Sequence, residues 1–167
     1  MAEMHLRRMD ERDRSEVAEL ICVSTNTWYQ VRGNPAVFPA GPEATDIYFG
    51  VYEAMDPGCG VVAENPRNGR LMGSCFYHPR PQHVSLGIMN VHPNYFGRGV
   101  ARALLEFIIE YTENSGYQAL RLTQSAMNLD SFSLYTRAGF VPRCAYQDLL
   151  IQVPASGLPH KAAGREH

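Results

Sequence analysis

The stretch HPNYFGRGVARALL, residues 92–105, decides how this 167-residue chain folds. A strand-like run ends just before it at Val91, and a helical pattern begins within it, because apolar residues recur at spacings of three and four: Val100, Ala103, Leu104, Phe107, Ile108 and Tyr111. Gly97 and Gly99 lie between strand and helix, where the absence of a Cβ permits a tight turn and close approach of a ligand. The first helical turn carries unpaired N–H groups and partial positive charge. We therefore interpret this junction as a grip for the pyrophosphate of a coenzyme.

Two other phosphate-binding motifs do not fit this junction. The P-loop needs Gly-x-x-x-x-Gly-Lys followed by Ser or Thr, and the chain contains no such run. The dinucleotide fingerprint needs a third Gly or Ala three residues after the second glycine, and Arg102 stands at that position.

The junction instead resembles the acetyl-CoA-binding motif of the GCN5-related N-acetyltransferase (GNAT) superfamily. In that family a strand ending in Val-x-Pro leads to Gln or Arg, two further residues, Gly, one residue, and Gly or Ala. The strand end is matched by residues 91–93, and the loop by Gly97, Gly99 and Ala101. Phe96 stands where the family usually has Gln or Arg, which removes one side-chain contact and leaves the backbone amides in place.

A second block strengthens the resemblance. Asn128 is followed seven residues later by Tyr135 and then by Gly139 and Phe140, which is similar to the fourth-helix signature of the family. Gly139 also fits the left-handed residue that commonly follows the end of a helix. The two blocks cover residues 84–140, and the rest of the chain resembles the family by its order of elements.

The composition indicates one compact domain. A chain of 167 residues with 45% apolar content can bury a core of its own. A formal net charge of −2 argues against a general nucleic-acid-binding protein, which is usually basic. No apolar run approaches the roughly 18 residues of a membrane span. The first eight residues carry no hydrophobic core of a signal peptide, so we expect a cytoplasmic location and no membrane partner.

Neither cysteines nor histidines suggest a metal. The four cysteines are scattered without a Cys-x-x-Cys pair, which argues against a zinc site or a disulfide framework, and we expect them to be small buried hydrophobes: Cys22, Cys59, Cys75 and Cys144. The six histidines form no His-Glu-x-x-His motif.

Periodicity predicts a mixed α/β (α+β) fold in the order β-α-α-β-β-β-α-β-α-β, which is also the order of the GNAT superfamily. The sheet should be antiparallel over its first strands and parallel where helices cross over. The predicted elements are strand 4–9, helix 13–29, helix 42–55, strands 60–64, 71–78 and 84–91, helix 100–114, strand 119–123, helix 128–138 and one or two strands in 143–153. We expect a single acyltransferase domain over residues 1–153 and a flexible tail over 154–167.

The resemblance implies which residues hold acetyl-CoA. Loop and first-turn amides would grip the pyrophosphate, with Arg98 and Arg102 facing the phosphates. The strand before the loop would splay from its parallel neighbour, so that its backbone binds the pantetheine arm as an added strand does and polarises the thioester carbonyl. The residues expected at the coenzyme are Met89, Val91, Phe96, Gly97, Arg98, Gly99, Val100, Ala101, Arg102, Asn128 and Ser131.

Tyr135 is the expected catalytic acid. A thiolate leaving group has a pKa of about 8.5, so a neighbouring phenol can protonate it, and Tyr135 matches the tyrosine of the family. Three of these residues have a structural alternative: core packing for Tyr135, capping of the helix for Asn128, and plain solvent exposure for Arg102.

The general base is left open. An alkyl amine has a pKa of about 10 and must lose a proton to attack. The family often uses a carboxylate on the strand before the loop, yet residues 84–91 contain none. His78, His83 and His92 lie near enough to be considered, each with the alternative of an ordinary loop or strand-end residue, and a water relay is equally compatible.

We therefore expect an acetyl-CoA-dependent N-acetyltransferase that acts on a primary amine of a small molecule or peptide by direct attack. The acceptor should lie against the first two helices, where aromatic residues are more often core than pocket: Trp28, Tyr29, Phe38, Tyr48, Phe49 and Tyr52. The alternative, favoured by Phe96 and the missing carboxylate, is a non-catalytic acyl-CoA-sensing or interaction module. A longer acyl donor and a homodimer are both compatible with the sequence.

Overall fold

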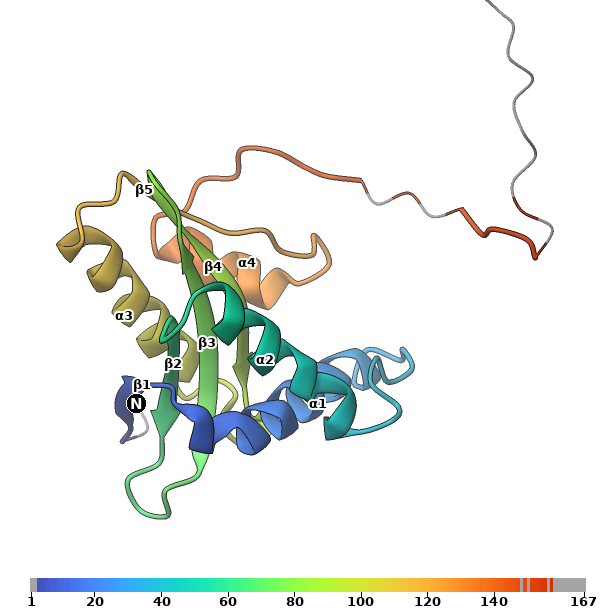
Figure 1. The fold of residues 1–167 in the computed structure, drawn as a ribbon, viewed down its shortest axis with the longest axis horizontal. Helices are drawn as coiled ribbons and strands as arrows, with labels where there is room; N and C mark the ends of the chain where they lie inside the picture. Colours follow the sequence, from blue (N-terminus) through green and yellow to red (C-terminus); the bar gives the residue numbers. More distant parts are fainter. Residues whose placement is uncertain (1–2, 148, 150, 156, 158–167) are drawn as a thin grey trace, which may run out of the picture.

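The computed structural model describes residues 3–147, 149, 151–155 and 157. The strands are β1 (His5–Arg8), β2 (Gly60–Glu64), β3 (Leu71–Pro79), β4 (His83–Val91) and β5 (Ala119–Arg121). The helices are α1 (Arg14–Gln30), α2 (Asp46–Met55), α3 (Val100–Asn114) and α4 (Leu129–Arg137), with short 3-10 turns η1 (Glu11–Asp13), η2 (Pro42–Thr45) and η3 (Pro93–Tyr95). Figure 1 shows their arrangement around one sheet.

The sheet has the order β1-β2-β3-β4-β5 within the described residues. The first four strands pair antiparallel, and β4 pairs parallel with β5 after the crossover through α3. This confirms the predicted mixed, mostly antiparallel sheet. The predicted helices and the first five strands are present, with ends that differ by a few residues.

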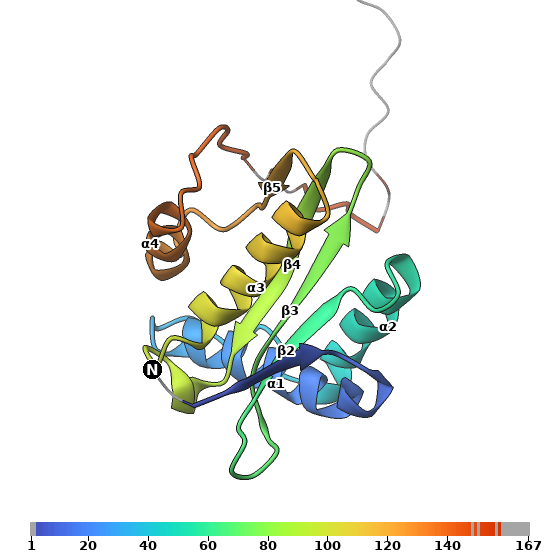
Figure 2. The same cartoon turned by 90° about the vertical axis from the view of Figure 1, so that its left-hand side faces the viewer.

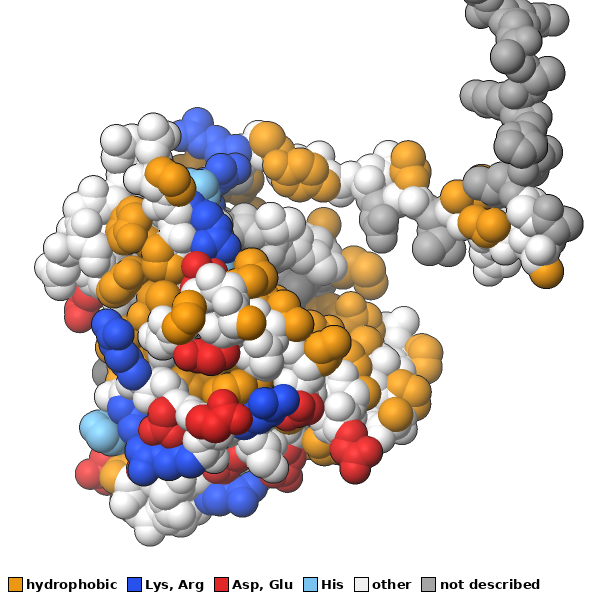
Figure 3. All heavy atoms as spheres, viewed as in Figure 1, with side chains coloured by type: hydrophobic (Ala, Val, Ile, Leu, Met, Phe, Trp, Pro, Cys, Tyr) orange, Lys and Arg blue, Asp and Glu red, His pale blue; other side chains and the backbone are white. Residues whose placement is uncertain are grey.

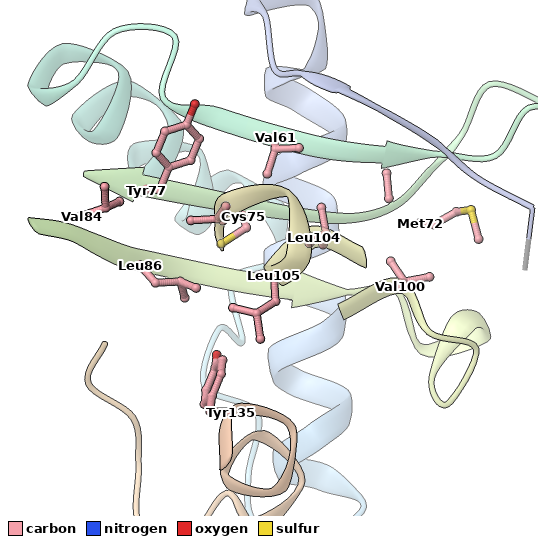
Figure 4. Packing of buried hydrophobic residues seen from close by; sticks show 12 residues of the cluster. Val61, Met72, Cys75, Tyr77, Val84, Leu86, Val100, Leu104, Leu105 and Tyr135 are labelled. Atoms are coloured by element: carbon pink, nitrogen blue, oxygen red, sulfur yellow. The ribbon is translucent and has the colours of Figure 1, made fainter. Parts of the chain in front are cut away.

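Helices cover both faces of the sheet (Figure 2). On the face that we call the α3 face, α3 and α4 pack against residues such as Cys75, Tyr77 and Leu86. On the opposite α1 face, α1 and α2 pack against Phe76 and Val62. Figure 4 shows the α3-face core closely, with Leu104, Leu105 and Tyr135 directed toward β3 and β4. Each fully buried Leu there contributes about 1.5–3 kcal/mol.

Gly73 sets the distance between α3 and the sheet. A Cβ at this position would lie 2.8 Å from Cγ1 of Val100 and 2.9 Å from the carbonyl oxygen of Asn90. Because both neighbours are held in place by the core and the sheet, only glycine allows α3 to lie this close. The close approach brings the first turn of α3 to the end of β4, where the predicted coenzyme loop lies.

The predicted strand in 143–153 was wrong for the described residues of that range, which have no strand pairing. Leu149, Ile151 and Val153 alternate as in a strand, but their exposed fractions are 82%, 70% and 63%. Alternation predicts a strand only where a neighbouring strand supplies hydrogen bonds, and the edge strand β5 is only three residues long. Of the predicted tail, residues 156 and 158–167 lie outside the described residues.

Candidate functional site

β4 has an open edge. Its parallel pairing with β5 joins only His83 to Ala119, Val84 to Leu120 and Ser85 to Arg121. From Leu86 to Val91, β4 has no strand partner on that side within the described part of the chain. Extended ligands bind such unpaired strand edges through their own polar groups. The end of the parallel pairing at Ser85 is compatible with the predicted splay before the loop.

A bulge in β4 lies at the start of the open edge. Cys75 pairs with Met89 and Tyr77 with Leu86, so two residues of β4, Gly87 and Ile88, stand opposite Phe76 alone. A Cβ on Gly87 would lie 2.9 Å from the carbonyl oxygen of Phe76. The bulge turns the strand and re-aims the side chains that follow it.

The loop between β4 and α3 presents backbone N–H groups. Gly97 and Gly99 have φ of 72° and 88°, the left-handed region in which glycine is favoured. The first helical hydrogen bond is donated by Ala103 to the carbonyl oxygen of Gly99, at 3.0 Å, so the N–H groups of residues 100–102 precede the ladder. A Cβ on Gly97 would meet no atom within 4 Å. Free donors and open space make this loop suited to an anionic group.

The predicted cationic and aromatic contacts at the loop have different surroundings. Arg98 is exposed, and its guanidinium carbon lies 5.9 Å from the ring centroid of Tyr95. Arg102 donates through Nε to Glu106 at 2.7 Å, one turn along α3. Phe96 is 47% exposed. The guanidinium of Arg98 has no ion-pair partner among the described residues and can face a ligand in the loop. The guanidinium of Arg102 instead forms a surface ion pair with Glu106.

Tyr135 of α4 reaches the open edge from the α3 face. Its side chain is 9% exposed and joins the core that includes Leu86 and Leu105 (Figure 4). Burial raises the pKa of Tyr135 to about 12, so the phenol keeps its proton at neutral pH. The ring also lies 5.7 Å from that of Phe140. The packing alternative is thus observed, and the position is compatible with the acid role.

The predicted contacts at the start of α4 are explained in part by capping. The side chain of Asn128 accepts the backbone N–H of Ser131 at 3.0 Å, as a residue that caps a helix does. Met89 and Val91, the strand residues predicted at the pantetheine arm, are half-buried on the open edge of β4. The coenzyme roles of all four residues stay predictions.

The α1 face of the site carries His78, one of the three histidines considered as a base, together with a carboxylate partner that the sequence did not reveal. Nδ1 of His78, near the end of β3, lies 2.7 Å from Oδ2 of Asp56, the residue after α2. Arg80 donates to both carboxylate oxygens of Asp56, at 2.8 and 3.1 Å. Nε2 of His78 is buried without a hydrogen-bond partner within the residues the structure describes. Asp56 comes directly after α2 and before Pro57-Gly58. In the sequence this position is typical of a turn, so nothing there indicated a partner for His78.

Asn90 of β4 forms a second polar group on the α1 face. Its Nδ2 donates to Oγ of Ser24 at 2.6 Å, while its Oδ1 is buried and has no partner in the described structure. A buried carbonyl left without a donor costs about 1–3 kcal/mol, so this oxygen is a ready acceptor for an N–H group.

The aromatic residues of the first two helices are less buried than expected. Of the six, Phe49 alone is classed as buried, at 1% exposure, and the others are half-buried. Tyr52 lies 4.9 Å from the ring of Phe76 and 4.8 Å from that of His78. Figure 3 shows hydrophobic side chains gathered over α2 on this face, with charged side chains below them. Phe38, Tyr48 and Tyr52 thus pack against the edge of the α1-face core, and Tyr52 also contacts His78.

Metal ligands and membrane helices are absent from the described residues. No three His, Cys, Asp or Glu side chains there come together as a metal would require. Cys22 and Cys75 are buried as expected, whereas Cys59 is half-buried and Cys144 is exposed. Within the same residues, no helix combines the length and the apolar character needed to cross a membrane.

Comparison with known proteins gives one family and one curated relative. The model of the "Acetyltransferase (GNAT) family" matches residues 24–140. The UPF0157 protein YqkA of Bacillus subtilis is 34% identical over 74 residues, which is 44% of this chain and 21% of that protein. The match thus spans about a fifth of the relative's length.

Solved structures share the fold at low identity. A putative acetyltransferase of Pyrococcus horikoshii has a TM-score of 0.69 at 18% identity over 84% of this chain and 44% of its own. The ribosomal-protein-S18-alanine N-acetyltransferase of Escherichia coli has a TM-score of 0.65 at 19% identity, covering 93% and 87%. A GNAT family acetyltransferase of Brucella melitensis in complex with acetyl-CoA has a TM-score of 0.58 at 17% identity, covering 79% and 82%.

Proposed function

This chain belongs to the acetyltransferase (GNAT) family, and on that premise we propose that it transfers an acetyl group from acetyl-CoA to a primary amine of a small molecule or peptide. The observation that carries the proposal is two neighbouring sets of unpaired backbone groups. One lies along the open edge of β4 from Leu86 to Val91, and the other comprises the N–H groups of Gly97, Gly99 and the first turn of α3.

These two sets fit the two parts of the coenzyme. The open edge of β4 suits an extended pantetheine arm, whose amides can pair with strand groups. The loop suits a pyrophosphate, since the N–H groups of its two glycines and of the first turn of α3 are free and Gly97 leaves room. Acetyl-CoA, when bound, supplies the acetyl thioester. The acetyl-CoA complex of the Brucella relative supports this choice of donor.

We assign Tyr135 the role of acid for the leaving sulfur. Its side chain shares the α3-face core with Leu86, the first residue of the open edge, and its raised pKa of about 12 keeps the proton available over the physiological range. A positioned acid contributes typically 10²–10⁴-fold to a rate. In the proposed reaction Tyr135 gives its proton to the thiolate as the carbon–sulfur bond breaks.

The acceptor is expected on the α1 face. The half-buried rings of Phe38, Tyr48 and Tyr52 lie there, together with the free acceptor of Asn90. An amine attached to a partly apolar body, or the amino end of a peptide, fits these surroundings better than a polyamine with several charges. The E. coli structural relative is a ribosomal-protein-S18-alanine N-acetyltransferase by its name, which keeps peptides among the candidates.

The test is acetyl transfer to a panel of amines. Purified protein is incubated with acetyl-CoA and one acceptor: benzylamine, phenethylamine, spermidine or a tripeptide with an N-terminal alanine. The free thiol of CoA and the acetylated product are both measured. We expect equal amounts of thiol and product with benzylamine, phenethylamine or the tripeptide. Acetyl-CoA binding without acetylation of any amine would contradict the proposal and favour a non-catalytic acyl-CoA-binding module.

A further inference from the structure

The His78 ring makes a different contact through each of its nitrogens. Nδ1 meets the Asp56 carboxylate, while a Cβ on Gly87 would lie 2.7 Å from Nε2. The His78 side chain is 9% exposed and that of Asp56 is 13% exposed. Nε2 is the nitrogen without a hydrogen-bond partner among the described residues. One nitrogen is thus fixed and the other is left unused.

The bond to Asp56 decides which nitrogen carries the proton. Arg80 donates to both oxygens of Asp56, and this pairing is the main cause that lowers the pKa of the carboxyl group. An ionised carboxylate only accepts hydrogen bonds, so Nδ1 of His78 must donate. When the ring is neutral, its lone pair therefore lies on Nε2, the arrangement that a general base requires.

The free nitrogen faces the place where β4 leaves β5. Asp56 lies just before β2 in the chain. Cys59, which joins the two, accepts the backbone N–H of Tyr77 through its carbonyl oxygen. Asp56 therefore lies on the β2 side of His78. Gly87 lies on the β4 side, two residues beyond Ser85, the last residue of β4 that pairs with β5. Nε2 is therefore adjacent to the start of the open edge, on the face opposite Tyr135.

We propose that Nε2 of His78 takes the proton from the acceptor amine, with Asp56 as the residue that positions it. The inference rests on the proposed function. The acceptor first loses one proton to water and reacts as the neutral amine. As the nitrogen–carbon bond forms and the carbon–sulfur bond breaks, a second proton passes from the nitrogen to Nε2, and the thiolate takes one proton from Tyr135. Exchange with water returns His78 and Tyr135 to their starting states.

The groups around His78 define what a pH profile reports. Asp56 and Tyr52 face the ring from α2 and its C-cap, and Arg80 faces Asp56 from the end of β3. β4 contributes the uncharged Gly87 and Ser85, the latter paired with His78 in register. Asp56 has a lowered pKa and Tyr52 a raised one, so neither changes charge near neutral pH. An acid limb in the pH profile would therefore not report the titration of Asp56 or Tyr52.

The experiment compares His78→Gln with wild type on the panel amine that wild type acetylates fastest. Glutamine can still donate to Asp56 but cannot take a proton. We expect kcat/KM to fall by about 10²-fold or more and its acid limb to disappear, with acetyl-CoA affinity unchanged. Added imidazole should restore part of the rate of His78→Ala. Asp56→Asn should lower kcat/KM by less than His78→Gln does, and should shift the acid limb of the pH profile rather than remove it.

His83→Gln is the matched control, because His83 is a half-buried histidine on the neighbouring strand with no role in the proposed chemistry. It should keep the rate and the limb. A folded His78→Gln protein with the wild-type rate and limb would overturn the inference while leaving the proposed function intact. A wild type without any transferase activity would instead contradict the proposed function.

A second measurement decides the inference without activity. The 15N shifts of the His78 ring in wild-type protein report which nitrogen carries hydrogen. A protonated Nδ1 with a bare Nε2 that shifts when acetyl-CoA is added supports the proposal. A proton on Nε2 in the neutral ring, or Nε2 shifts that ignore acetyl-CoA, contradicts it. This result is available even if every variant at His78 fails to fold.

Discussion

The two faces of the sheet beside the open edge of β4 differ in kind. On the α3 face, the hydroxyl of Tyr135 enters a core of Leu86, Leu105 and Val84. On the α1 face, polar groups are held in place by other polar groups: His78 by Asp56, and Asn90 by Ser24. One face offers a phenolic proton donor in apolar surroundings, and the other offers acceptors for protons and N–H groups.

This difference suggests that the two faces of the sheet serve different proton transfers. A leaving thiolate needs a proton, and an attacking amine must lose one, so the two events are best served by groups that do not neutralise each other. The sheet separates Tyr135 from His78, and the open edge of β4 beyond Ser85 borders both faces. The predictions that follow test whether the two faces act separately.

The largest expected effect is at Tyr135. Tyr135→Phe should lower kcat by about 10²-fold or more with acetyl-CoA affinity unchanged, because the phenol donates only during the reaction. Tyr77→Phe is the matched control: Tyr77 is also buried on the α3 face, and burial raises its pKa to about 12 as well. Steady-state kinetics and calorimetry measure both. Equal kcat losses in the two variants, or none in either, would contradict a catalytic Tyr135.

The next effect concerns the loop. Gly97→Ala should weaken acetyl-CoA binding by about tenfold, or ~1.4 kcal/mol, since the added methyl group occupies the space left for the ligand. Gly58→Ala is the control, because Gly58 has φ of 71° against 72° for Gly97, and both have open surroundings. Each change should cost about 1 kcal/mol of stability from strain at positive φ. Equal affinity in the two variants would remove the loop from the binding site.

A stability measurement tests the burial of Tyr135. Its pKa is raised from 10.0 to about 12, so the folded state favours the protonated phenol. The stability that this burial contributes is complete below pH 10 and is lost as pH rises through 12. Between pH 10 and 12, the unfolding free energy of wild type should therefore fall relative to that of Tyr135→Phe. Denaturant titrations at matched pH check it, and a constant difference would mean that the phenol is solvated.

The smallest effect is expected where α1 and α4 touch. Arg32 donates to Asp130 at 2.8 Å and lies over the Trp28 ring at 4.0 Å, joining the end of one helix to the start of the other. The pair is exposed, so Arg32→Ala should cost less than about 1 kcal/mol. Arg12→Ala, which breaks the exposed pair with Asp10, is the comparison for thermal melting. A much larger loss at Arg32 would show that this contact holds the two faces together.

Short-range signals made the α3 face and the loop predictable. The glycines at 97 and 99 and the spacing of α3 lie within one stretch, and the block from Asn128 to Phe140 lies within another. The α1 face depends instead on contacts between distant residues, such as His78 with Asp56, 22 positions apart, and Asn90 with Ser24, 66 positions apart. Periodicity carries no information about such pairs. The predicted strand in 143–153 failed for a related reason, since its alternation could not reveal whether a pairing partner exists.

Titration calorimetry with acetyl-CoA, with desulfo-CoA and NADH as comparisons, tests the central claim most directly, because every assigned role depends on the coenzyme binding along β4 and the loop. The account predicts saturable binding of acetyl-CoA, binding of desulfo-CoA through the shared pyrophosphate and pantetheine arm, and no binding of NADH. Failure to bind acetyl-CoA, or equal binding of NADH, would contradict it.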